Sequence, residues 1–343
     1  MKTSESLTSP VHGGQLNGAA KTYNISVDKW IDLSTGINPN GWPIPEIPAF
    51  VYQRLPEEND DLISAARLYY GAESVMAIAG SQAAIQMLPG LRPYSRVGVV
   101  YPGYQEHAHC WRNVGHQVQL LSPEDIEAHL DVIDVLVIIN PNNPTGMIFS
   151  KEQLEQWHSR LAERNGWLVV DEAFMDCEPE NSLIPLSPKN GLIILRSIGK
   201  FFGLAGLRVG FIFAEQSLLD NLAQRLGPWS ISNPSRYITA HALMDSSWHV
   251  KTGIELKSKS RRLFNLMSES GLSPYGGTHL FQSVNHPYAV ELHEQLAKRG
   301  VLVRIFQQSS SLRFGLPKDE DAWDRLKISL NKAMLKLDGI NLK

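Results

Sequence analysis

The sequence has few cysteines and no long apolar run. Only Cys110 and Cys177 occur among 343 residues. Two cysteines are too few for a disulfide framework and lack metal-site spacing, so we expect buried apolar thiols and no metal. No stretch approaches the roughly 20 apolar residues that span a bilayer. The opening MKTSESLTSPVHGG lacks the pattern of a signal peptide. These absences predict a cytoplasmic protein with no membrane partner.

Neither sign of charge is in large excess. The chain has 32 Lys and Arg against 35 Asp and Glu, a formal net charge of −3. Such a balance creates no broad electrostatic field that would attract nucleic acid or an anionic membrane. The first 45 residues also lack a basic helix-turn-helix pattern. We therefore expect a small-molecule ligand and no nucleic-acid partner.

Short apolar runs alternate with amphipathic stretches through the middle of the chain. Several runs contain three or four consecutive Val, Ile or Leu residues, which is typical of strands buried on both faces. A helix is predicted over 151–166, where Leu154, Trp157 and Leu161 share one face. The pattern predicts an α/β fold with a mainly parallel central sheet flanked by helices. The predicted strands are 96–102, 134–141, 167–174, 191–197 and 208–215.

The character of the sequence changes near residues 227–236. Beyond them we expect a long helical segment, GTHLFQSVN, a helix around AVELHEQLAKRG, the strands VLVRIF and SLRFG, and a final helix from Asp319. Residues 1–45 are rich in Gly, Asn and Pro and are typical of an extended arm rather than a packed unit. We predict a large α/β domain over 46–234. Residues 1–45 and 235–343 together would form the arm and a smaller α+β domain.

The segment SIGKFFGLAGLRVG follows a predicted strand and carries Ser197, Lys200 and Arg208. A lysine that attacks an aldehyde needs a lowered pKa and a fixed position. A hydroxyl and a guanidinium beside it suit a phosphate group. A glycine-rich turn with a solvated lysine explains the same residues, and taken alone they favour that simpler interpretation.

Three other motifs contain groups that could bind a phosphate or an aromatic ring with polar atoms. DEAF places Asp171 at the carboxyl end of a strand, where open sheets bind ligands, and a carboxylate there can keep a pyridine nitrogen protonated. A helix cap is the alternative role. NPNNPTG contains Asn143, whose amide can donate to a ring oxygen. AGSQAAI is a small-residue turn into a helix that offers backbone N–H groups to a phosphate. Each motif is weak by itself.

The order of the motifs is more specific than any one of them. The succession GSQA, PGYQEH, NPNNPTG, DEAF and SIGK, with an arginine eight residues later, resembles the aspartate-aminotransferase fold family of pyridoxal-phosphate enzymes. The resemblance spans most of the chain. It implies a fold type I transferase with a seven-stranded central sheet and pyridoxal 5'-phosphate as cofactor. It also implies a homodimer with active sites at the subunit boundary.

The resemblance implies a role for each motif residue. Lys200 would form the covalent link to the cofactor aldehyde, and Asp171 would pair with the pyridine nitrogen, which makes these two the catalytic residues. Tyr104 would stack on the ring, and Asn143 would bind the ring hydroxyl. His107 matches a position that supports the aspartate in some members, although an ordinary surface histidine is the alternative. The cofactor phosphate would be held by Gly80, Ser81, Gln82, Ser197 and Arg208.

Two positions depart from the family pattern. Many members have tyrosine three residues after the aspartate, where it bonds the ring oxygen, but this chain has Phe174. Many members also have a YP sequence from which a neighbouring subunit lends a tyrosine to the phosphate. This chain reads RLPE there, with Leu55 in place of the tyrosine. Each departure removes one expected hydrogen bond to the cofactor.

Segments outside the cofactor motifs indicate a narrower family. HGGQL, DLSTGINPNGWP, RLPEENDDL, GTHLFQ, VLVR and LRFGLP resemble the threonine-phosphate decarboxylases of the cobalamin pathway. That resemblance implies decarboxylation of L-threonine O-3-phosphate to (R)-1-aminopropan-2-yl phosphate. The ring stabilises the carbanion left when a bond at the alpha carbon breaks, and Lys200 is the natural acid to protonate it.

A substrate with a carboxylate and a phosphate needs two cationic anchors. Arg304 and Arg313 stand on neighbouring predicted strands. We expect Arg313 to bind one end of the substrate and Arg304, with His12, the other, while exposed salt bridges are the alternative for both arginines. Gly36 stands where related decarboxylases have asparagine, so only its backbone can contact the ligand. The other predicted substrate residues are Gly13 and Asn143, with Asn38 a weaker candidate.

Two other functions remain open from the sequence. A histidinol-phosphate aminotransferase shares nearly the same cofactor motifs, but HGGQL, LRFGLP, Leu55 and Phe174 argue against it. A non-catalytic binding protein of the corrin pathway is the second alternative. A binding protein has no need of an electron sink, so Lys200, Asp171 and Asn143 argue against it. The fold alone cannot decide between decarboxylation and transamination.

Overall fold

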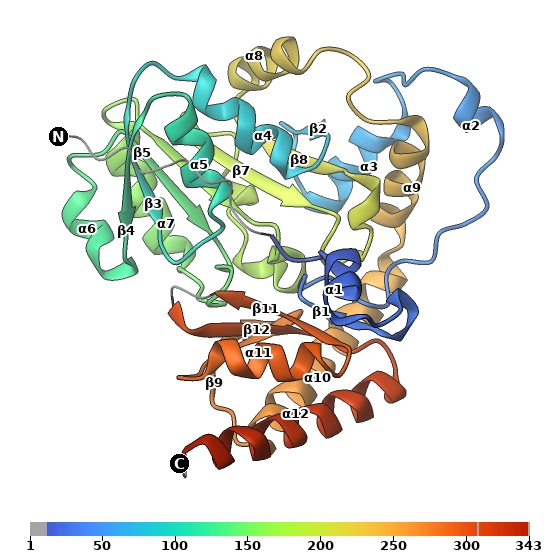
Figure 1. Cartoon of the computed structure of the whole chain (residues 1–343). Helices are drawn as coiled ribbons and strands as arrows, with labels where there is room; N and C mark the ends of the chain where they lie inside the picture. Colours follow the sequence, from blue (N-terminus) through green and yellow to red (C-terminus); the bar gives the residue numbers. More distant parts are fainter. Residues whose placement is uncertain (1–11, 307–308, 342–343) are drawn as a thin grey trace.

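The computed structural model describes residues 12–306 and 309–341, which form two sheets with helices around them (Figure 1). The larger sheet has seven strands in the order β2-β8-β7-β6-β5-β3-β4. Strand β8 runs antiparallel to its neighbours β7 and β2, and the other pairs are parallel. The strands are β2 (Met76–Ile78), β3 (Arg96–Val100), β4 (Gln117–Leu121), β5 (Val135–Ile139), β6 (Trp167–Asp171), β7 (Leu192–Ser197) and β8 (Gly210–Phe213).

The five strands predicted for the central sheet are confirmed as β3, β5, β6, β7 and β8. All five residues of β5 are buried, as expected for a strand covered on both faces. Two strands were missed. Strand β2 has only three residues, and β4 is an edge strand with mostly exposed side chains, so neither contains a run of Val, Ile or Leu like those of the buried strands. The seven-stranded sheet flanked by helices agrees with the predicted fold class.

Helices pack against this sheet on both sides (Figure 1). The predicted helix after β5 is confirmed as α7 (Lys151–Ala162), which buries Leu154, Trp157 and Leu161 and begins at Ser150, whose hydroxyl accepts from the Gln153 amide. The other main helices here are α3 (Asp61–Tyr70), α4 (Ser81–Met87), α5 (Glu106–Asn113), α6 (Ile126–His129), α8 (Gln216–Leu226) and α9 (Asn233–Met244).

The second sheet has five strands in the order β1-β11-β12-β10-β9, and both parts of the chain that flank the larger sheet contribute to it. Helices α11 and α12 lie along it, below the strands in Figure 1. The strands are β1 (Ile31–Leu33), β9 (Pro274–Thr278), β10 (Phe281–Asn285), β11 (Val301–Phe306) and β12 (Ser311–Gly315). The helices are α10 (Ser246–Glu269), α11 (Ala289–Ala297) and α12 (Glu320–Asn341).

The expectation of an extended arm over residues 1–45 is wrong for part of that segment. Leu16–Tyr23 form helix α1, and β1 pairs in parallel with β11 from the other end of the chain. A three-residue strand is too short to show a pattern, and its partner is about 270 residues away in sequence, so local reasoning cannot find the pairing. The boundaries of the two proposed domains, at 45/46 and 234/235, stay a prediction.

The cysteine thiols are not paired with each other. Cys110 is buried and Cys177 is partly buried. Within residues 12–306 and 309–341, no group of three or more His, Cys, Asp or Glu side chains is arranged to hold a metal ion. Among the same residues, no helix has the length and apolar character needed to cross a membrane.

The loop after β5 packs directly on the second sheet. The Ser283 hydroxyl donates to the Pro144 carbonyl over 2.6 Å. Gly146 has φ +74°, and a Cβ atom there would lie 2.2 Å from the Gly277 carbonyl oxygen. This position tolerates only glycine, both for its backbone conformation and for its space. The loop that carries Asn143 is therefore held between the two sheets.

We predict that Gly146→Ala destabilises the protein by more than about 2 kcal/mol, because strain at positive φ adds to a clash with backbone. The midpoint of urea unfolding measures this loss of stability. Gly253→Ala is the matched control, since Gly253 lies inside α10 with open space around its Cα. There the change should stabilise by roughly 0.5–1 kcal/mol. Equal midpoints for the two variants would contradict the prediction.

Candidate active site

Lys200 lies just beyond β7 and is partly buried. Burial is the main reason that its pKa falls to about 8, and the positive charges of Arg313 and Arg208 lower it further, while Asp171 raises it. Its ammonium nitrogen lies 5.3 Å from the ring centre of Phe174. The interpretation of Lys200 as a solvated lysine in a surface turn is therefore wrong. An amine with such a pKa is partly uncharged near neutral pH and can act as a nucleophile.

Asp171 ends β6 and is buried. One carboxylate oxygen lies 3.0 Å from His107 Nε2, and the other accepts the Ala173 amide over 3.1 Å. His107 is only 1% exposed, so the interpretation as an ordinary surface histidine is wrong. The two contacts fix the orientation of the carboxylate.

The register of the antiparallel pair β2–β8 brings Gly80 to Arg208. Ile78 is opposite Gly210, so the turn that leaves β2 lies against the turn that enters β8. Gly80 has φ +74°, and a Cβ there would lie 2.8 Å from Arg208 Nη2. Only glycine leaves this space open beside the guanidinium. Ser197 lies at the end of the neighbouring strand β7, where its hydroxyl accepts the Gly199 amide.

Hydrogen bonds link Tyr104, Gln82 and Glu106, and Glu106 lies within ion-pair distance of His12. The Tyr104 hydroxyl donates to Gln82 Oε1 over 3.2 Å, and Gln82 Nε2 donates to Glu106 Oε2 over 3.0 Å. The other oxygen of Glu106 lies 2.7 Å from His12 Nε2. Burial, with the charges of Glu106 and Asp171, raises the pKa of Tyr104 well above its usual range. Tyr104 is therefore a neutral phenol at physiological pH.

Arg313, on β12, is a buried cation that forms no ion pair with a carboxylate in the described part of the chain. Its Nη1 donates to Asn143 Oδ1 over 2.5 Å, and its Nη2 donates to the Ser34 carbonyl over 2.6 Å. The buried Nε has no hydrogen-bond partner. Burial, then the charge of Arg304, lowers its pKa to about 9. Such a group is costly unless an anion binds to it.

Arg304 is directly opposite Arg313 in the β11–β12 pair, which confirms that the two arginines stand on neighbouring strands. The Arg304 guanidinium lies 5.1 Å from the ring centre of Phe306. Burial lowers its pKa as well. Two adjacent arginines give this part of the second sheet the positive charge expected for an anionic ligand.

Three residues near the amino end border this region. Gly36 has φ +62°, and a Cβ there would lie 3.7 Å from the Arg313 guanidinium carbon and 3.2 Å from the Phe281 ring. Gly13 lies against Ser34, whose carbonyl oxygen would be 2.5 Å from a Cβ. Asn38 is bonded to the protein itself, since its amide donates to the Phe201 carbonyl over 2.9 Å. Asn38 thus shapes the chain around Lys200 rather than facing a ligand with its amide.

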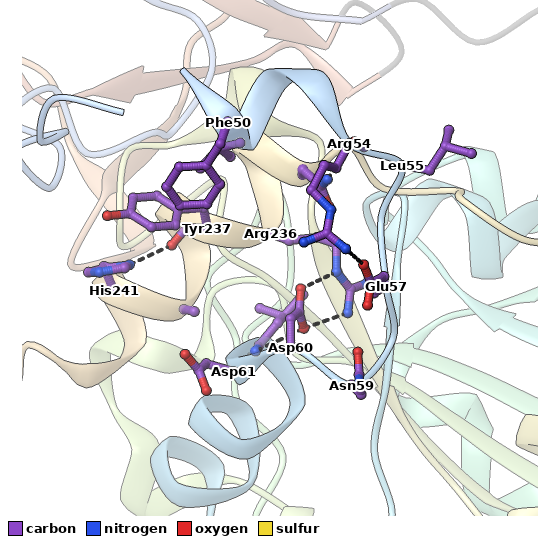
Figure 2. A pocket seen from close by; sticks show the side chains of 14 residues that line it. Phe50, Arg54, Leu55, Glu57, Asn59, Asp60, Asp61, Arg236, Tyr237 and His241 are labelled. Atoms are coloured by element: carbon purple, nitrogen blue, oxygen red, sulfur yellow. Dashed lines mark hydrogen bonds and ion pairs between the residues drawn. The ribbon is translucent and has the colours of Figure 1, made fainter. Parts of the chain in front are cut away.

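Leu55 is not among the residues that surround Lys200 and Arg313. It is 63% exposed and projects outward at the edge of a pocket of about 270 Å³ (Figure 2). The pocket lies between the segment that contains α2 (Phe50–Gln53) and helices α3 and α9. Its most prominent polar contact is the pair of Arg236 with Asp60, in which Nη2 donates to Oδ1 over 2.7 Å.

Sequence reasoning missed a buried ion cluster directly behind the site. Arg196 Nε lies 3.1 Å from Glu172, and its Nη1 lies 2.9 Å from Asp176. Burial raises the pKa of Asp176 to about 6. The sequence signal was the arginine within the apolar strand LIILRS. A buried arginine needs a buried anion as its partner, so it indicates an ion cluster. Glu106 was also missed, although it lies inside the PGYQEH motif.

We predict that Lys200 reacts with a small neutral aldehyde at lower pH than the other lysines. Its pKa of about 8 lies below the ordinary value of about 10.4, so the free amine is half-formed near pH 8. Reductive labelling of the cofactor-free protein, followed by peptide mass spectrometry, should show half-maximal modification of Lys200 near pH 8. Lys251, whose side chain is exposed, is the internal control for the labelling reaction. Parallel pH profiles would contradict the prediction.

The chain is similar to known proteins over nearly all its length. The profile of the family "Aminotransferase class I and II" matches residues 52–326. A threonine-phosphate decarboxylase of Pseudomonas aeruginosa is 51% identical over 93% of this chain and 96% of its own. Another, from a Sinorhizobium species, is 37% identical over 95% of this chain and 98% of its own.

The solved structures agree on the fold. A histidinol-phosphate aminotransferase from Sinorhizobium meliloti, in complex with pyridoxal-5'-phosphate, superposes with a TM-score of 0.83 over 98% of this chain and 99% of its own, at 18% identity. At that identity the likeness shows the fold alone. Taken with the profile and the two decarboxylases, it shows that the chain belongs to the class I and II aminotransferase family and, within it, to the threonine-phosphate decarboxylases.

Proposed function

We propose that the chain decarboxylates L-threonine O-3-phosphate to (R)-1-aminopropan-2-yl phosphate with pyridoxal 5'-phosphate as cofactor, as a cytoplasmic enzyme of cobalamin biosynthesis. The observation that carries the proposal is the 51% identity, over 93% of the chain, to a threonine-phosphate decarboxylase. The buried Arg313, which has no carboxylate partner in the described part of the chain, supports an anionic substrate.

The residues around Lys200 fit this cofactor. The space that Gly80 leaves beside Arg208 suits a phosphate, with Ser81, Gln82 and Ser197 as the other proposed phosphate residues. Asp171 is a buried carboxylate that contacts the His107 ring. A negative charge in this position suits a protonated pyridine nitrogen. Tyr104 is the proposed stacking residue.

Asn143 fits the role of donor to the ring hydroxyl. Its carbonyl oxygen already accepts from Arg313, so its amide group is the part left to donate. Phe174 has no hydroxyl to add a second bond there. Asn143 therefore stands between the proposed cofactor site and the proposed substrate anchor.

Bound at this position, the cofactor supplies an aldehyde for covalent attachment and a ring that withdraws electrons from the alpha carbon of the substrate. Lys200 holds it before the reaction. Asp171 keeps a negative charge opposite the ring nitrogen, in an orientation fixed by His107 and the Ala173 amide. In its protonated form, the Lys200 ammonium would be the acid that donates the proton replacing the carboxylate on the alpha carbon.

In the proposed mechanism, the arginines would select the bond that breaks, because they would orient the substrate. Only a bond held perpendicular to the cofactor ring overlaps its π system, so a decarboxylase must turn the carboxylate out of the ring plane. We propose that Arg313 binds one anionic end of the substrate and that Arg304 and His12 bind the other. The backbone of Gly13 and Gly36 and the side chain of Asn143 complete the site.

We expect the purified protein, loaded with cofactor, to release carbon dioxide and aminopropanol phosphate from L-threonine O-3-phosphate without an amino acceptor. Carbon dioxide trapping and phosphorus NMR measure both products. Histidinol phosphate is the parallel substrate. An oxo product that forms only with an amino acceptor would contradict the proposal and favour a histidinol-phosphate aminotransferase. Tight binding of substrate with no turnover would instead favour a non-catalytic binding protein.

Two variants connect the assay to the site. Lys200→Ala should abolish turnover, and borohydride treatment of the unaltered enzyme should leave a pyridoxyl group on the Lys200 peptide. Arg313→Gln should lower kcat/KM by about 100-fold, which corresponds to loss of a buried charged hydrogen bond. Full activity of either variant would remove its residue from the proposed site.

We also propose a homodimer, formed through the face that carries Phe50, Tyr52 and Leu55. Their exposed fractions of 61%, 63% and 63% are high for apolar side chains that lie so close together. Sedimentation should give twice the 38.3 kDa of one chain. Phe50→Asp with Leu55→Asp should weaken the dimer, whereas Leu335→Asp, an exposed position on α12, should not. A monomer that still binds cofactor would contradict the proposal.

A further inference from the structure

The amino-terminal residues 12–14 connect the two sheets. His12 Nε2 lies 2.7 Å from Glu106, at the start of helix α5, which packs against the larger sheet. Two residues later, the Gly14 amide donates to the Ser34 hydroxyl over 2.8 Å, just after β1 of the second sheet. Gly13 lies so close to Ser34 that a Cβ would be 2.5 Å from its carbonyl oxygen. The segment is thus held by one contact on each sheet.

Glu106 is an unusual partner for such a segment because it is itself buried, with only 8% of its surface exposed. It stands in the first turn of α5, where the helix dipole favours a carboxylate. Its second oxygen accepts from Gln82, which in turn accepts from Tyr104. One ion-pair contact and two hydrogen bonds therefore connect four side chains, from the amino-terminal segment to the proposed cofactor site.

The charge of Glu106 makes its contact with His12 important. A buried carboxylate is stable only with a cation or several donors around it. In the part of the chain that the structure describes, His12 is the one basic side chain within ion-pair distance of Glu106. Gln82 supplies a neutral donor and is shared with Tyr104. When His12 leaves, Glu106 loses its only basic partner, so the position of the segment and the order of Gln82 and Tyr104 depend on each other.

We propose that Glu106 is a positioning residue that docks the amino-terminal segment through His12 and holds the imidazole beside the substrate. The role of His12 toward substrate rests on the proposed function. The docking itself does not, because it follows from contacts within this chain. Glu106 touches neither reacting atoms nor the proposed cofactor groups directly, and it acts through His12 and Gln82.

Amide hydrogen exchange tests the docking without any reaction. In the cofactor-loaded protein, Glu106→Gln should speed exchange of the Gly14 amide by about tenfold, the effect of losing one charge-assisted hydrogen bond. His12→Ala should speed it by a similar factor, and the double variant should be no faster than either single one. Glu152→Gln is the matched control, since Glu152 also stands in the first turn of a helix but is exposed. It should leave the Gly14 exchange unchanged.

Kinetics with L-threonine O-3-phosphate give the second readout. Glu106→Gln and His12→Ala should raise KM about tenfold more than they lower kcat, because they remove binding rather than a group that transfers a proton. Multiplied effects in the double variant, or unchanged Gly14 exchange in Glu106→Gln, would overturn the proposal. If the unaltered protein does not decarboxylate this substrate, the proposed function fails, but the exchange experiment still decides whether Glu106 docks the segment.

Discussion

The site depends on one buried guanidinium that joins three distant parts of the chain. Arg313 comes from β12, Asn143 from the loop after β5, and Ser34 from the turn after β1. Because Arg313 is buried, its hydrogen bonds cannot be exchanged for water without a large cost. The contact therefore fixes the second sheet against the larger one at the place where an anionic substrate would lie. The unpartnered Nε shows that the protein alone does not satisfy this group.

A second constraint lies behind the sheet and follows from strand alternation. Asp171 and Ser197 point to the side of Lys200, so their neighbours Glu172 and Arg196 point to the opposite face. There Glu172, Arg196 and Asp176 form a buried ion cluster, and Glu172 also accepts from Ser182 over 2.6 Å. The cluster ties the end of β6 to the end of β7. Asp171 and Ser197, which are proposed to face the cofactor, are thus held in place by their own neighbours in sequence.

Much of the fold could be predicted because it is built from local patterns. The strands after which Asn143, Asp171 and Lys200 stand are apolar runs, and the ends of parallel strands meet at one edge of a sheet. Strand β1 could not be predicted, since three residues pair with a strand far along the chain. Glu106 and Arg196 were overlooked because their roles come from partners that are not near them in sequence. The sequence motifs indicate the candidate site residues. Only the packing shows which buried charges lack a partner of opposite charge.

The distribution of charge also bears on reaction type. Around Lys200 the structure places one carboxylate, Asp171, and two guanidinium groups, Arg208 and Arg313, as the charged groups that act on the amine. Arg208 lies beside the proposed position of the cofactor phosphate, so the cations proposed for the substrate are Arg313 and its cross-strand neighbour Arg304. A phosphorylated amino acid brings a phosphate and a carboxylate, whereas histidinol phosphate brings only the phosphate. A substrate with a phosphate alone supplies an anion for one end of this arginine pair and none for the other. The pairing of Arg313 with Arg304 therefore favours a substrate that still carries its carboxylate when it binds.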